Sequence, residues 1–210
     1  MAMQFEHAEH TLETIRTLME RSQRYEHLSG YSGLVAGGLA LAGSAALAGH
    51  WLPVPADAAF AIVWTTVFVL AFATNAVLTA NRARRRGEPV WSRRARTVTL
   101  AVLPSFVTGV AISIPLARTG QLQFLPAVWL TLYGCGALAT SFFAPRSIAA
   151  LGATCLVLGI ASLLVLPGWP LLTMAVGFGL THVFFGFSVL VAERREEREQ
   201  AFWAAVEHIK

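Results

Sequence analysis

The sequence predicts an all-α membrane protein, a bundle of six transmembrane helices with amphipathic cytoplasmic helices at its N- and C-terminal ends. The first reason is composition: 55% of the 210 residues are hydrophobic and only 13% are charged, whereas about 25% of the residues in soluble domains are charged. The second reason is charge placement, because fifteen of the sixteen Lys and Arg residues fall on one side of the membrane that the apolar stretches would cross.

The transmembrane domain is predicted over residues 30–192. A helix needs about 20 mostly apolar residues to cross the hydrocarbon core of a bilayer. Six stretches meet this requirement: residues 30–51, 57–80, 97–117, 124–143, 147–166 and 170–192. Little of the chain is left to form a soluble core. The flanking segments 1–29 and 193–210 are expected to be helices in the cytoplasm.

An arginine-rich segment separates the second and third crossings. It contains Arg82, Arg84, Arg85, Arg86, Arg93, Arg94 and Arg96. Positive residues in short loops mark the cytoplasmic side of a membrane, so we predict that both termini are cytoplasmic, with Arg118 alone on the other side. The cluster serves as a topogenic signal, or it also attracts anionic lipid headgroups, and the two interpretations are compatible.

The N-terminal segment, residues 1–29, has apolar residues at every third or fourth position. They are Phe5, Ala8, Leu12, Ile15 and Met19. This spacing is typical of an amphipathic helix or a short coiled-coil seam. A helix of this length is marginal alone, so we expect its apolar side to be buried against the membrane surface, the C-terminal helix or a second copy of the protein.

The C-terminal segment, residues 193–210, continues the last crossing with a dense run of charges. It then places Phe202, Val206 and Ile209 on one face. One interpretation is a solvated helical extension. The other is that the two terminal helices pack together beneath the membrane and form a small platform for a partner protein.

His182 is the one ionisable side chain in the middle of a predicted crossing. It shares a helix face with the small residues Ala175, Gly179 and Gly186, where a neighbouring backbone can approach closely. Because ionisable groups are costly in lipid, we expect His182 to point into the bundle. It is either a neutral imidazole bonded to a neighbouring helix, or a proton relay or ligand contact, since histidine can change charge near neutral pH.

Asn75 and Tyr133 supply further polar atoms inside predicted crossings. With His182 they either line a narrow cavity or act as hydrogen-bonding contacts between helices. The sequence has no paired carboxylates, P-loop or metal-ligand set, so we expect no enzyme activity, no cofactor and no metal. The net charge of +4 comes from the arginine-rich loop beside two membrane helices, which argues against a nucleic-acid partner.

The junction IRTLMERS at residues 15–22, followed by LSGYSG at residues 28–33, resembles a group of small bacterial multi-spanning membrane proteins. Members of this group open with a similar I-R-x-x-M-E-R-S helix that runs into L-S-G-x-S-G. The resemblance implies a bacterial inner-membrane protein without assigned activity, sometimes encoded near winged-helix regulators. It carries no functional residue over to this chain.

Two functional hypotheses follow. The first is a non-enzymatic inner-membrane scaffold or sensor, whose cytoplasmic helices bind a partner protein or another protomer. The alternative is a small transporter or channel for a neutral or proton-coupled solute, with His182 on the path. A cavity that water can reach at His182 would favour transport, and a dry, close-packed His182 would count against it.

Overall fold

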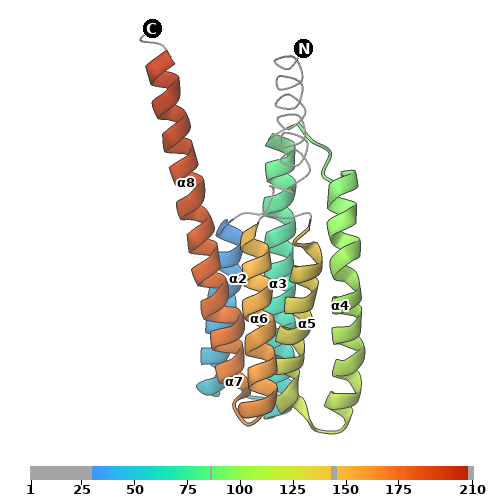
Figure 1. The fold of residues 1–210 in the computed structure, drawn as a ribbon. Coiled ribbons are helices and arrows are strands. Elements are labelled where there is room, and N and C mark those ends of the chain that lie inside the picture. Colours follow the sequence, from blue (N-terminus) through green and yellow to red (C-terminus); the bar gives the residue numbers. More distant parts are fainter. Residues whose placement is uncertain (1–29, 86, 143–145, 208–210) are drawn as a thin grey trace.

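The computed structural model describes residues 30–85, 87–142 and 146–207, and within these ranges the regular structure is helical throughout (Figure 1). The elements in chain order are α2 (Gly30–Ala48), α3 (Ala56–Arg85), α4 (Arg93–Arg118), the short 3-10 helix η1 (Leu122–Phe124), α5 (Leu125–Thr140), α6 (Arg146–Val165), α7 (Pro170–Thr173), the π-helix η2 (Met174–Leu180) and α8 (Thr181–Glu207). The last three run on from one another as a single rod.

Six helices among the described residues are long and apolar enough to cross a membrane, and each corresponds to one predicted crossing. This part of the prediction is confirmed. The ends differ, because α3 continues to Arg85 and α4 already begins at Arg93. Arginine has high helix propensity, so these helices extend past the apolar run that defines a crossing. The predicted helix over residues 1–29 lies outside the described residues.

Two other predicted crossings end earlier in the structure than the sequence indicated. Helix α2 ends at Ala48 rather than Trp51, because His50 adopts a positive φ of 52° and turns the chain. Helix α5 ends at Thr140, and Phe143 lies outside the described residues.

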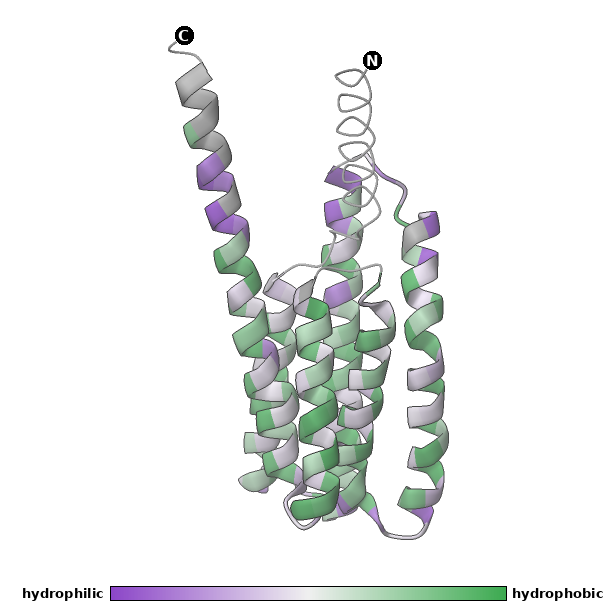
Figure 2. Ribbon diagram, in the orientation of Figure 1, coloured by the Kyte–Doolittle hydropathy of each residue, from purple (hydrophilic) through white to green (hydrophobic). Residues whose placement is uncertain are grey.

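The helices of the bundle are mostly hydrophobic between their ends, as Figure 2 shows. Large hydrophobic side chains such as Phe72, Val110 and Leu164 are exposed on α3, α4 and α6. A water-soluble monomer rarely exposes contiguous apolar surface on this scale. The arrangement is that of a multi-pass membrane protein, in which lipid covers the outward-facing side chains.

Glycines determine which helix backbones lie closest to each other. Helix α2 packs on α8 and η2, and α5 packs on α6. A Cβ atom at Gly37 of α2 would lie 2.6 Å from the carbonyl oxygen of Gly179, and one at Gly134 of α5 would lie 2.7 Å from that of Gly152. Only glycine permits backbones to approach this closely, so these two pairs form the tightly packed side of the bundle.

Helix α4 lies at the edge of the bundle and packs mainly on α5 (Figure 1). Its described link to α3 is a contact between the rings of Phe106 and Phe68, whose centroids are 5.8 Å apart. Most side chains of α4 are exposed or half-buried. This helix therefore presents most of its surface to lipid.

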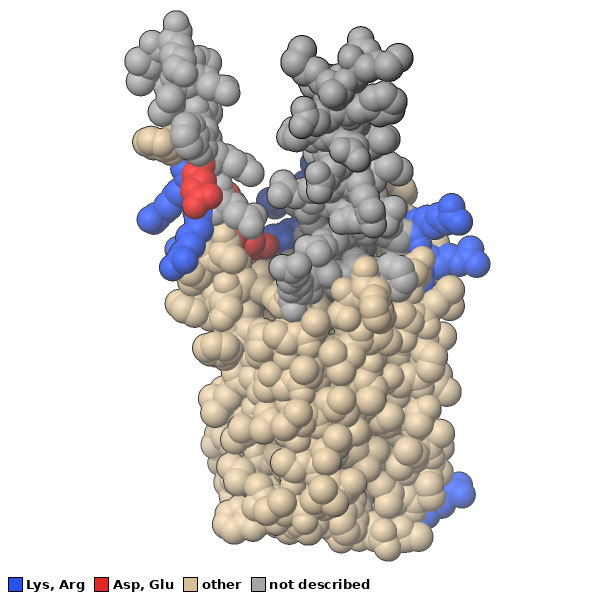
Figure 3. Space-filling view, in the orientation of Figure 1, with Lys and Arg blue, Asp and Glu red and all other residues tan. Residues whose placement is uncertain are grey.

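Most charged side chains gather at one end of the molecule (Figure 3). The last turn of α3 carries Arg82, Arg84 and Arg85. An ion pair of 2.8 Å between Arg82 Nη2 and Glu193 Oε1 joins this turn to α8, so the charged parts of α3 and α8 share that end. Arg118, in the last turn of α4, lies at the opposite end.

Candidate functional site

His182 lies one residue into α8, and its ring is enclosed by protein, with the residue 7% exposed. Its Nε2 atom is 2.8 Å from the hydroxyl oxygen of Tyr133 on α5. The two residues are 49 positions apart in the sequence, and the packing of α5 near the sixth crossing brings them together. They form the central polar pair of the bundle.

The second ring nitrogen identifies the tautomer. His182 Nδ1 is 2.8 Å from the carbonyl oxygen of Phe178, and a carbonyl can only accept a hydrogen bond. Nδ1 therefore carries a proton and donates it. In a neutral ring Nε2 is then the acceptor and the Tyr133 hydroxyl is the donor, so both nitrogens of His182 are satisfied without a charge in the bundle.

The pair lies beside the π-helix η2, whose backbone bonds join residues five apart instead of four. The amide of Thr181 accordingly donates to the Val176 carbonyl. Side chains also donate to three successive carbonyls of η2: Thr181 Oγ1 to Val176 at 2.9 Å, Cys155 Sγ to Gly177 at 3.9 Å, and His182 to Phe178. In lipid, backbone groups released from regular pairing need such partners.

Aromatic and aliphatic side chains close the site. The ring of Phe178 stacks on His182 at 5.8 Å between centroids, and its edge contacts Tyr133. Leu130 and Cys155, which are both fully buried, belong to the cluster on which Tyr133 and Phe178 pack. The surroundings of His182 are therefore close-packed and apolar apart from its two hydrogen bonds.

The structure separates the third polar candidate from this pair. Asn75 is half-buried on α3, a helix that packs chiefly on α2. No hydrogen bond joins Asn75 to Tyr133 or His182 within the described ranges. Position in the sequence indicated only that all three residues lie inside crossings, and it did not indicate which helices are neighbours.

The arginines predicted as topogenic or lipid-binding lie at the charged end. Arg84, Arg85, Arg93 and Arg96 are exposed there, and Arg82 is half-buried in its ion pair with Glu193. Arg86 and the side chain of Arg94 lie outside the described part of the chain.

Sequence reasoning missed the partners that complete the site, Cys155 and Thr181, and it missed the π-helix itself. A weak signal was present. Gly177 and Gly179 lie two residues apart just before Thr181 and His182, and glycine lowers the preference for a regular α-helix. A second buried contact, between the hydroxyls of Ser162 on α6 and Thr173 on α7, was also not predicted.

Comparison with known proteins gives no further guide, since no family model, curated protein or solved structure matches the chain. The function is therefore inferred from the geometry of the chain itself.

Proposed function

We propose that this protein is a non-enzymatic scaffold or sensor of the bacterial inner membrane, with both termini in the cytoplasm. Its cytoplasmic helices bind a partner protein or another protomer. The observation that carries the proposal is the continuous helical rod from Pro170 to Glu207. This rod includes the buried His182 and continues to a point well beyond the bundle (Figure 1).

The extension of α8 beyond the bundle suits a protein partner. Helix α8 continues for 14 residues past Glu193, which is about 21 Å at the rise of an α-helix. Residues 193–199 hold four Glu and three Arg, and further along Phe202 is 62% exposed. A mixed charge pattern keeps this segment in water, and an exposed aromatic side chain is a common anchor at protein interfaces.

The bundle holds this extension in a defined position. Inside the membrane, α8 packs closely on α2, where a Cβ atom at Gly33 would lie 3.0 Å from the Cα atom of Gly186. At the membrane surface, Glu193 pairs with Arg82 of α3. A rod fixed at two levels presents its extension to a partner with little loss of conformational entropy.

The orientation rests on the arginines. The end of the molecule that carries the α8 extension also carries Arg82, Arg84, Arg85, Arg93 and Arg96. Arg118 is at the opposite end. The excess of positive charge favours the cytoplasm for the first end, and α8 then extends into the cytoplasm.

The geometry gives less support to the transport alternative. A histidine on a solute path needs a face that water or solute can reach. The ring of His182 is buried, stacked on Phe178 and hydrogen-bonded through both nitrogens. These contacts favour a structural role for the pair in fixing the rod.

The orientation is tested by labelling introduced cysteines in a Cys135→Ser background, in which the remaining Cys155 is buried. Phe202→Cys is in the α8 extension, and Gln121→Cys is an exposed position in the loop at the opposite end. We expect a membrane-impermeant maleimide to label Gln121→Cys in intact cells and Phe202→Cys only after lysis. The reverse pattern would overturn the orientation.

The scaffold function is tested with the same two variants and a cysteine-reactive crosslinker in native membranes. We expect Phe202→Cys to give a discrete adduct with a cytoplasmic protein or a second copy of the chain, identified by mass spectrometry. Gln121→Cys is the matched control and gives no such adduct. If Phe202→Cys gives no adduct, or the same adducts as the control, the proposal is wrong.

A further inference from the structure

The connection between α3 and α4 is far more basic than the α8 extension that lies at the same end. Residues 81–96, the α3–α4 hairpin, contain seven Arg and a single acidic residue, Glu88. Residues 193–199 contain three Arg and four Glu. Of these two segments, only the hairpin therefore carries a net positive charge.

The arginines of the hairpin begin where the lipid-facing surface ends. Val77 and Leu100 are exposed apolar residues on α3 and α4, and they lie five and four residues from Arg82 and Arg96. These separations are about 6–8 Å along a helix, a distance that the long arginine side chain can span. The guanidinium groups are thus at the level of phospholipid headgroups.

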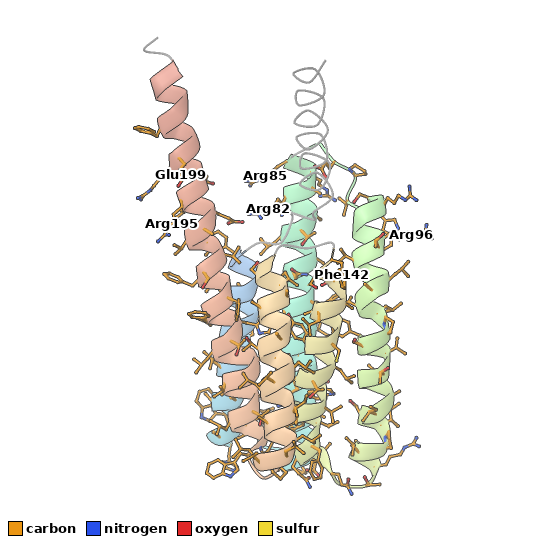
Figure 4. All side chains as sticks on the ribbon, in the orientation of Figure 1. Arg82, Arg85, Arg96, Phe142, Arg195 and Glu199 are labelled. Atoms are coloured by element: carbon orange, nitrogen blue, oxygen red, sulfur yellow. The ribbon has the colours of Figure 1, made fainter. Side chains whose placement is uncertain are left out.

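Two exposed aromatic side chains lie toward the same end of the molecule. Trp91, in the loop of the hairpin, is 68% exposed, and Phe142, just past the end of α5, is 86% exposed. Figure 4 shows Arg85, Arg96 and Phe142 at this end of the bundle. Tryptophan rings favour the boundary between hydrocarbon and headgroups, which places the loop within the interface rather than free in water.

We infer that the α3–α4 hairpin binds the headgroup of an anionic phospholipid, with arginines from the last turn of α3 and the first turn of α4 contacting its phosphate and Trp91 lying beside it in the interfacial region. Guanidinium groups bind phosphate oxygens in pairs of parallel hydrogen bonds. The N-terminus of α4, capped by Ser92, adds a favourable dipole for an anion.

The charge of the hairpin selects an anionic lipid over a zwitterionic one. A phosphatidylcholine headgroup carries its own cation, which the remaining arginines repel. A phosphatidylglycerol headgroup carries none, and each basic residue near the surface contributes about 1 kcal/mol to its attraction, or roughly fivefold in partitioning. The inference does not depend on the proposed scaffold function, because it concerns a different segment.

The test is lipid selection by the full-length protein in nanodiscs made from phosphatidylglycerol and phosphatidylcholine. Native mass spectrometry measures the lipids retained on release. One variant carries Arg85→Gln, Arg93→Gln and Arg96→Gln. The matched control carries Arg194→Gln, Arg195→Gln and Arg198→Gln, which removes the same number of exposed charges from α8.

We expect the wild type to retain phosphatidylglycerol preferentially, the hairpin variant to lose at least tenfold of that preference, and the α8 control to stay within about twofold of wild type. Equal losses in both variants would overturn the inference, as would a wild type without preference. Added inorganic phosphate that displaces the lipid would also overturn it, because the site would then recognise a free anion.

A second measurement does not depend on charge removal. Brominated phosphatidylglycerol quenches tryptophan fluorescence at close range, and the difference between wild type and Trp91→Phe isolates the signal of Trp91. We expect stronger quenching by brominated phosphatidylglycerol than by brominated phosphatidylcholine. Equal quenching by the two lipids, or none, would contradict the placement of Trp91 beside the bound lipid.

Discussion

The α2–α8 and α5–α6 pairs differ from the α3–α4 pair in what holds the helices together. Glycines bring the first two pairs into backbone contact, whereas aromatic rings such as Phe68 and Phe106 link α3 to α4. In lipid, an apolar surface does not by itself favour a neighbouring helix over an acyl chain. Small residues therefore determine which helices pack closely, and helices without them expose more of their surface to lipid.

The largest effect is expected where glycine allows close approach. In Gly37→Ala the new methyl group would lie 2.6 Å from the Gly179 carbonyl oxygen, so α2 and the sixth crossing must separate. We expect a loss of about 1–3 kcal/mol in the free energy of unfolding, the usual cost of overpacking. Unfolding in detergent with increasing SDS measures it.

Gly38 provides the control for this comparison. It is the next residue on α2, and a Cβ atom there would meet no atom of a neighbouring helix within 4 Å. Gly38→Ala is expected to leave stability unchanged or to raise it by up to about 1 kcal/mol, because alanine has the higher helix propensity. Equal destabilisation by the two substitutions would show that glycine packing does not hold this side together.

The buried polar pair is expected to contribute less than the glycines. Tyr133→Phe removes the hydroxyl that donates to His182 Nε2 and leaves a buried acceptor unsatisfied, which costs about 1–2 kcal/mol. A double-mutant cycle with His182→Phe measures the coupling between the two side chains. Strict additivity would show that the hydrogen bond contributes nothing.

The ion pair at the membrane surface is expected to contribute still less to the free energy of unfolding. Glu193→Gln breaks its bond to Arg82, and because both side chains are partly exposed we expect a loss of at most about 1 kcal/mol that shrinks at high salt. Glu197→Gln, an exposed position on the same helix, is the control. A salt-independent loss for Glu193→Gln would contradict a screened ion pair.

The smallest effect is expected on the lipid-facing side. Phe68 is exposed on α3 and contacts Phe106 of α4. Phe68→Leu exchanges one lipid-facing apolar side chain for another, so we expect a change within about 0.5 kcal/mol in the same SDS titration. A loss as large as that of Gly37→Ala would mean that aromatic contacts hold α3 and α4 together as firmly as glycines hold the other helix pairs.

The six crossings could be predicted from the sequence because a bilayer fixes the length and polarity of any helix that spans it. Their ends were less predictable, since helix formation by α3 and α4 continues into the arginine-rich segments. The sequence also indicated His182 and Tyr133 separately. Their pairing depends on how α5 packs near the sixth crossing, and no local pattern records that.

The π-helix could not be predicted for a related reason. Its hydrogen bonds are completed partly by Cys155, which belongs to α6. A helical wheel of the sixth crossing contains the donors Thr181 and His182 but not the thiol of Cys155. Similarly, the arginine pattern predicted a charged end, but it did not predict that Glu193 would bind Arg82.

The wide turn of η2 gives the sixth crossing at least one residue more than an uninterrupted α-helix would need over the same span. Losing an amino acid from a crossing normally rotates everything beyond it by about 100°, so that the wrong side chains meet the neighbours. Within Met174–Leu180 the same loss would instead convert the wide turn to a regular one and leave Thr181 to Glu207 in phase. Natural versions of this chain that differ in length inside a crossing are expected to differ at this segment.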